Sequence, residues 1–80
     1  MKNYTYEEFK RDIMHGHEFE FEYGAERYSV SQNSDGWYIT RFRDVHEQFF
    51  HNQIELLENG RIEEKPIWEI WGKIKNLDIF

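Results

Sequence analysis

The sequence predicts an α+β fold with two layers, in which helices pack on one face of a three-stranded antiparallel meander in the order α-β-β-β-α-α. Acidic and aromatic residues alternate strictly from 18 to 23, which is the period of a half-buried strand. Residues typical of tight turns follow at 24–25 and at 33–36. Helical apolar spacing flanks this region on both sides, so helices cover the apolar face and the other face stays open. The 80 residues form one α+β domain, residues 1–80.

The first helix is predicted to begin after Thr5. The segment Thr5–Glu8 has the pattern of a capping box, in which Thr5 accepts from the Glu8 amide and the Glu8 carboxylate accepts in return from the Thr5 amide. Gly16 supplies the left-handed exit. The apolar residues at helical spacing are Tyr6, Phe9, Ile13 and Met14.

The first two strands are predicted to pair in one register around Gly24-Ala25. A glycine at the first central position of a two-residue loop suits a type II′ turn. Phe21 then faces Tyr28, and Glu22 faces Arg27. A slip of one residue would place phenylalanines opposite serines, so apolar contact selects this register. The remaining predicted pairs are Tyr23 with Glu26, Glu20 with Ser29, Phe19 with Val30 and Glu18 with Ser31.

The third strand, Trp37–Phe42, follows the turn Asn33–Gly36, and its register has two alternatives. An even loop leaves Tyr38 and Phe42 on the outer face beside the strand glutamates. An odd loop turns these aromatic residues inward. We prefer the even loop because it buries Ile39.

A polar loop, a short helix and a longer last helix are predicted to complete the chain. Residues 43–48 break the alternation and predict a loop, with a short fourth strand as the alternative. Asn52 begins a helix that ends at Asn59-Gly60. Pro66 is predicted as the first residue of the last helix. Its buried stripe is Ile67, Ile70, Trp71 and Ile74, and the apolar tail expected to fold back is Leu77, Ile79 and Phe80.

Composition restricts the partners. The net charge of −6 disfavours direct binding to nucleic acid or to an anionic membrane and favours a basic protein partner. The absence of cysteine excludes disulfides and thiolate metal sites. No apolar run is long enough for a signal peptide or a membrane span, so we expect a cytoplasmic protein.

No residue cluster predicts catalysis. The four histidines have no established metal-ligand spacing, and the glutamates of an open strand face should stay ionised. The sequence shows no glycine-rich phosphate loop, nucleophile elbow or Cys/His pair. We expect a protein that is not an enzyme and that needs no cofactor or metal.

Three runs in the chain, FEYGAERYSV, DGWYIT and ELLENGRIEEKPIWEIW, resemble short proteins of low-GC Gram-positive bacteria and of their phages and mobile elements, most of them of unknown function. In that pattern an Asn-Gly pair often forms the first turn, and the later segment often reads Ile-Asp-Gly-Lys. Gly24-Ala25 and Ile62–Lys65 depart from both. The resemblance implies a bacterial or phage source and no particular activity.

The leading hypothesis is an acidic module that binds another protein. Carboxylates about 7 Å apart along a strand match the spacing of phosphates, which predicts an inhibitor of a nucleic-acid-binding enzyme, of the anti-CRISPR or anti-restriction type. The alternatives are a solvated acidic surface, an immunity or antitoxin-like protein that blocks a toxin, and a homodimer formed through the open face. The predicted partner-binding residues are Glu18, Glu20 and Glu22 for charge and Tyr38, Phe42 and Trp68 as aromatic anchors.

Overall fold

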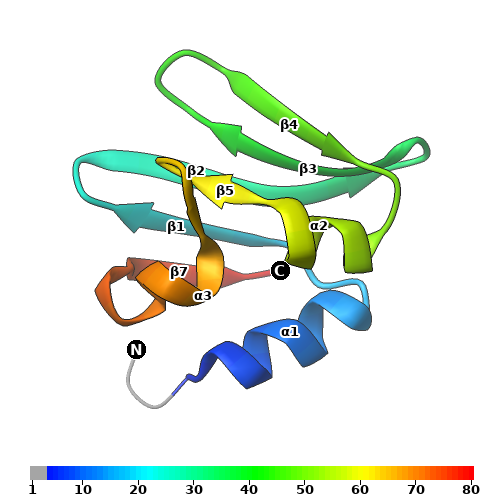
Figure 1. The fold of residues 1–80 in the computed structure, drawn as a ribbon, viewed down its shortest axis with the longest axis horizontal. Coiled ribbons are helices and arrows are strands. Elements are labelled where there is room, and N and C mark those ends of the chain that lie inside the picture. Colours follow the sequence, from blue (N-terminus) through cyan, green and yellow to red (C-terminus); the bar gives the residue numbers. More distant parts are fainter. Residues whose placement is uncertain (1–3) are drawn as a thin grey trace.

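The computed structural model describes residues 4–80 and confirms an α+β fold. Residues 1–3 of the predicted domain lie outside the described part. The main sheet is antiparallel and has five strands in the order β4-β3-β2-β1-β7, and β5 and β6 form a separate hairpin (Figure 1). The elements are α1 (Tyr6–Met14), β1 (Phe19–Tyr23), β2 (Glu26–Asn33), β3 (Gly36–Arg41), β4 (His46–Phe50), α2 (Gln53–Asn59), β5 (Arg61–Ile62), β6 (Lys65–Pro66), α3 (Ile67–Ile70), the 3₁₀ helix η1 (Trp71–Lys73) and β7 (Lys75–Ile79).

The predicted pairing of β1, β2 and β3 is confirmed. Phe21 lies opposite Tyr28 in the first pair, and Val30 lies opposite Ile39 in the second, as the even loop requires. In the first turn only Gly24 has a positive φ, 62°, which agrees with a type II′ turn. Cross-strand contact between apolar residues therefore determines the register, as the sequence predicts.

The prediction of three strands is wrong, because β4 and β7 extend the meander on both sides. Residues 46–48 were predicted as a loop but belong to β4, which pairs with β3. The apolar alternation fails there because His46 and Gln48 point inward to a polar pocket rather than to the core. The short fourth strand considered as the alternative is therefore present.

The last helix is much shorter than predicted. It covers Ile67–Ile70, continues as one 3₁₀ turn and gives way to β7, so Ile74 is extended rather than helical. Strand β7 pairs with β1. It forms hydrogen bonds with backbone groups of β1 that would be unpaired if β1 were an edge strand. The tail predicted to fold back is therefore part of the sheet, a long-range pairing that helical spacing cannot reveal.

Helices and hairpin cover one face of the sheet and bury the core between them (Figure 1). The capping box at Thr5 is formed, with Glu8 as its partner. In α2 the buried residue is Leu56, whereas Ile54 is 51% exposed. The core residues are Phe9, Ile13, Phe19, Phe21, Tyr28, Val30, Trp37, Ile39, Phe50, Leu56, Ile62, Ile67 and Ile70. Within residues 4–80, no helix is long and apolar enough to cross a membrane.

Replacing Gly36 by alanine should destabilise the fold. A Cβ at Gly36 would lie 2.4 Å from the Phe50 carbonyl oxygen, so β4 would have to move away from the start of β3. We expect Gly36→Ala to lower the free energy of unfolding by about 2 kcal/mol, measured by urea denaturation. Gly72→Ala is the control because its Cβ would meet no atom within 4 Å. Equal stability of the two variants would contradict the close approach of β4.

Candidate functional site

The sheet face opposite the helices is the first candidate site. Side chains alternate along each strand, and no element between residues 4 and 80 packs on this outer face. Its side chains therefore meet solvent or a partner. They are Glu20, Glu22, Arg27, Ser29, Ser31, Tyr38, Thr40, Phe42, Glu47, Phe49 and Asp78.

One half of the outer face is an acidic cluster around Arg27. The Arg27 guanidinium lies 2.9 Å from Glu20, 3.5 Å from Glu22 and 3.1 Å from Asp78. Its bonds to Glu20 and Asp78 raise the Arg27 pKa. Asn76 also donates to Glu22. Three carboxylates around one guanidinium leave the cluster with two excess negative charges, held in fixed positions.

Glu18 differs from the other two predicted glutamates. Its carboxylate accepts from the backbone amide of Gln32 at 3.2 Å, so it closes the end of the β1–β2 pairing. The acidic strand face is thus less uniform than the sequence predicts. Arg27 interrupts the row of carboxylates, and Glu18 has a local partner.

The aromatic side chains of the outer face come from β3, β4 and the residue that follows β3. Tyr38 and Phe49 face each other with ring centroids 5.3 Å apart, and Phe49 also contacts the His51 ring at 5.0 Å. Phe42 extends β3, because its amide donates to the Arg27 carbonyl. Phe42 and Phe49 are each 44% exposed. Tyr38, Phe49 and His51 form an aromatic patch, whereas Phe42 lies four residues further along the chain than Tyr38, next to Arg27 of the acidic cluster.

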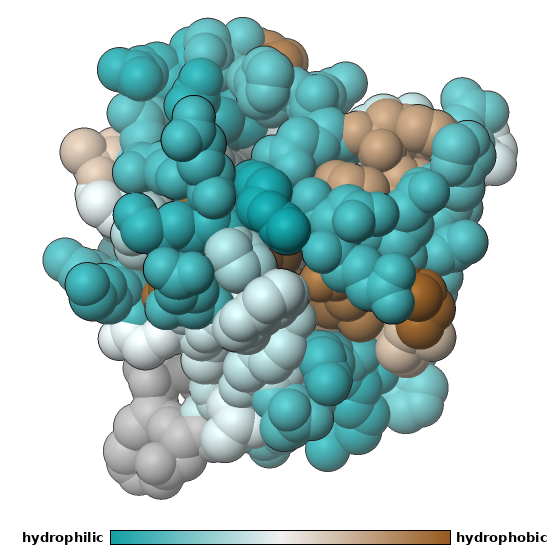
Figure 2. All heavy atoms as spheres, viewed as in Figure 1, coloured by the Kyte–Doolittle hydropathy of each residue, from teal (hydrophilic) through white to brown (hydrophobic). Residues whose placement is uncertain are grey.

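Trp68 lies elsewhere. It is on α3 in the helix layer and borders a shallow groove with Tyr6, Lys10 and Leu57. Figure 2 shows the helix side as mostly hydrophilic, with apolar atoms exposed near the meeting point of α1 and α2. The fold therefore brings Tyr38 and Phe42 to the side of Glu20 and Glu22, whereas Trp68 cannot share an interface with them.

Phe49 and Asp78 are outer-face residues that the sequence analysis missed. The predicted loop ends at residue 48 and leaves Phe49 unplaced, and Asp78 falls within the predicted apolar tail. Alternation in 46–50 could have revealed Phe49, since it places Phe49 and Phe50 on opposite faces. Asp78 had no such signal, because its position depends on β7 pairing with β1.

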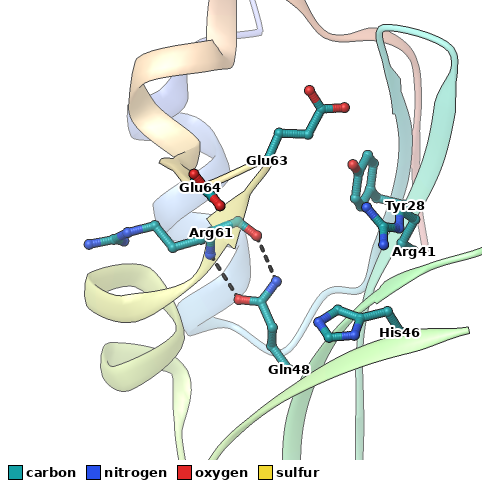
Figure 3. A pocket seen from close by; sticks show the side chains of 7 residues that line it. All are labelled: Tyr28, Arg41, His46, Gln48, Arg61, Glu63 and Glu64. Carbon is teal, nitrogen blue, oxygen red and sulfur yellow. Dashed lines mark hydrogen bonds between the residues drawn. The ribbon is translucent and has the colours of Figure 1, made fainter.

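The second candidate site is a pocket of about 650 Å³ between the sheet and the β5–β6 hairpin. Tyr28 and Arg41 form one wall, and Glu63 and Glu64 lie on the hairpin turn across from them (Figure 3). The remaining lining residues are His46, Gln48 and Arg61. Four strands, β2, β3, β4 and β5, and the turn after β5 thus contribute polar groups to one hollow.

The hairpin is held to β4 by the Gln48 side chain. The Gln48 amide donates to the Arg61 carbonyl at 2.6 Å and accepts from the Arg61 amide at 2.9 Å, as a strand backbone would. The turn has positive φ at both central residues, 51° at Glu63 and 71° at Glu64. This conformation favours Asn or Gly, so two glutamates hold it at a cost in strain.

Tyr28 has a buried hydroxyl without a hydrogen-bond partner. Its side chain is 3% exposed and lines the pocket, with the hydroxyl turned toward the interior (Figure 3). Burial, and then the charge of Glu63, raise the Tyr28 pKa. The Arg41 guanidinium lies close enough to the hydroxyl to oppose this shift, although no hydrogen bond of normal geometry joins the two groups. Asp44 clamps the guanidinium at 3.0 and 2.7 Å.

The described part of the chain contains no group of three or more His, Asp or Glu side chains arranged to hold a metal ion. The rings of two histidines each have one polar partner. His17 bonds the Phe80 carbonyl at 2.9 Å, and His51 lies 3.1 Å from Glu55.

Tyr28→Phe should stabilise the protein. The change removes a hydroxyl that loses water on folding and gains no partner, so we expect the free energy of unfolding to rise by about 1 kcal/mol in urea denaturation. Tyr4→Phe is the matched control, because the Tyr4 hydroxyl donates to Asp12 and its loss should destabilise. A Tyr28→Phe protein that is less stable would show that the hydroxyl is satisfied.

The Arg41–Asp44 clamp should depend on pH. Hydrogen bonds from Arg41 lower the pKa of Asp44 from 3.8 to about 2. The stabilising contribution is therefore fully present above about pH 4 and is lost as the pH falls toward 2. We expect Asp44→Asn to lower the Tm at pH 6, with the difference from the native protein disappearing near pH 2. Asp35→Asn, in an exposed turn, should show no such dependence.

Comparison with known protein families, with curated proteins and with solved structures finds no match to this chain. The resemblance to short proteins of low-GC Gram-positive bacteria stays a prediction. The case for function comes from the geometry of the two candidate sites.

Proposed function

We propose that this chain is a non-enzymatic module that binds a basic protein through the outer face of the sheet. The observation that carries the proposal is a face that no described element covers and that holds the aromatic pair Tyr38–Phe49, the exposed Phe42 and an acidic cluster next to Phe42. Aromatic rings supply contact area at interfaces, and fixed charges select the sign of the partner.

The cluster around Arg27 supports a basic partner, although Arg27 itself is positively charged. Glu20, Glu22 and Asp78 converge on one guanidinium, which leaves an excess of two negative charges and holds the carboxylates in place. A partner lysine or arginine would thus meet oriented acceptors that need little further ordering. The overall charge of −6 adds long-range attraction.

In its most specific form, the proposal is that the partner is a nucleic-acid-binding enzyme and the chain a phage or mobile-element inhibitor of the anti-CRISPR or anti-restriction type. The strand repeat of about 7 Å between alternate side chains, matching the spacing of phosphates, supports this form. Asp78 extends the acidic surface across β7, whereas Arg27 reduces it. The surface therefore fits one basic groove better than a long phosphate-binding channel.

Neutralising the acidic cluster should weaken binding and reduce its salt dependence. The test captures partners from a lysate of the source bacterium on the tagged protein, elutes them with salt and measures the affinity of the purified partner. We expect Glu20→Gln, Glu22→Gln and Asp78→Asn together to reduce affinity by at least about tenfold at low salt. The control set, Glu7→Gln, Glu58→Gln and Glu69→Gln, removes equal charge from the helix layer.

The aromatic patch is tested with the same partner. Tyr38→Ala should speed dissociation, whereas Trp68→Ala should leave it unchanged because Trp68 lies in the helix layer. If the outer-face and helix-layer variants lose the same affinity, the cluster contributes only through the net charge of the protein and not through its position. Light scattering that shows a dimer, abolished by Tyr38→Ala, would instead identify the outer face as a self-interface.

A further inference from the structure

We infer that the pocket between the sheet and the β5–β6 hairpin binds a small zwitterion, a molecule that carries a carboxylate and an ammonium group on one short skeleton. An α-amino acid is the simplest member of this class. The site is separate from the outer face, because Tyr28, Arg41 and Gln48 point to the other side of the sheet.

The pocket has two walls of opposite charge that do not pair with each other. Arg41 belongs to the strand wall, and Glu63 and Glu64 belong to the turn (Figure 3). Among residues 4–80, neither glutamate forms a salt bridge, and Arg41 pairs with Asp44. A ligand with both charges can meet both walls, whereas a simple cation or anion meets one and is repelled by the other.

Each wall is held in position by hydrogen bonds to neighbouring residues. Asp44 takes the Nε and Nη2 atoms of Arg41, which leaves Nη1 for a ligand. The Gln48 amide holds Arg61 at the base of the hairpin, and the turn beyond it keeps both glutamates in the left-handed region. Strain of this kind persists where surrounding structure enforces it and is common at ligand sites.

The buried Tyr28 hydroxyl is the independent observation that points to a ligand. It belongs to the strand wall of the pocket and lacks a partner, although burial makes an unpaired hydroxyl costly. A bound carboxylate would accept from this hydroxyl and from Arg41 Nη1, and the exposed His46 also lines the pocket. The ammonium group would then reach Glu63 or Glu64, which complete its hydrogen bonds.

The experiment is an NMR titration of the folded, isotope-labelled chain with glycine, β-alanine and γ-aminobutyrate, which differ in the separation of their charges. Propionate and propylamine supply each charge alone. Titrations extend to about 20 mM because ligands this small bind with modest affinity. We expect saturable amide shifts at residues 41–48 and 61–65 for at least one zwitterion, and weaker binding of both single-charge probes.

Variants assign the two ends of the ligand. Glu63→Gln with Glu64→Gln should weaken binding of the best zwitterion about tenfold, and Tyr28→Phe should weaken it although the variant stays folded. Glu69→Gln, an exposed glutamate outside the pocket, should bind as the native chain does. The inference is overturned if no zwitterion shifts these amides saturably, if propionate or propylamine binds as tightly, or if the pocket variants leave affinity unchanged. Loss of partner capture by outer-face variants has no bearing on these outcomes.

Discussion

The pairing of β1 with β2 is the constraint on which the other surfaces depend. Phe19 and Phe21 meet Val30 and Tyr28 across the pair, so both strands place their apolar side chains toward the helices. A slip of one residue would exchange the faces and expose the core. This register places Glu20 and Arg27 together on the outer face. It places Tyr28 on the inner face, where its side chain lines the pocket.

The two edge strands, β4 and β7, determine which side chains gather on each face of the sheet. Strand β7 covers the edge of β1 and brings Asp78 to Arg27, which changes a row of carboxylates into a network. Strand β4 covers β3 and splits its own residues between the faces, so Phe49 joins the aromatic patch while Gln48 holds the hairpin. The two strands that cover the edges of the meander therefore, between them, also supply residues to both candidate sites.

Local strain and an unpaired hydroxyl meet in the pocket, and nowhere else among residues 4–80 does a buried side-chain polar atom lack a partner. Glu63 and Glu64 occupy backbone positions that Asn-Gly would fill at lower cost. A turn optimised for stability alone would have neither glutamate. Binding sites often retain such unfavourable features, because the groups that serve a ligand are not those that best stabilise the empty protein.

The sequence by itself determined the capping box at Thr5, the first turn at Gly24 and the pairing of the first three strands. These features depend on residues close in the chain, whose alternation and turn chemistry leave one arrangement that buries the apolar side chains. It also placed Glu20, Glu22 and Tyr38 on a common face. Only the tertiary structure decided that the last apolar segment is a strand, since β7 pairs with residues 53 to 60 positions away, as in Phe19 with Ile79. The pocket was equally hidden, because Tyr28, Arg41 and Glu63 become neighbours only when β4 and the hairpin close on the sheet.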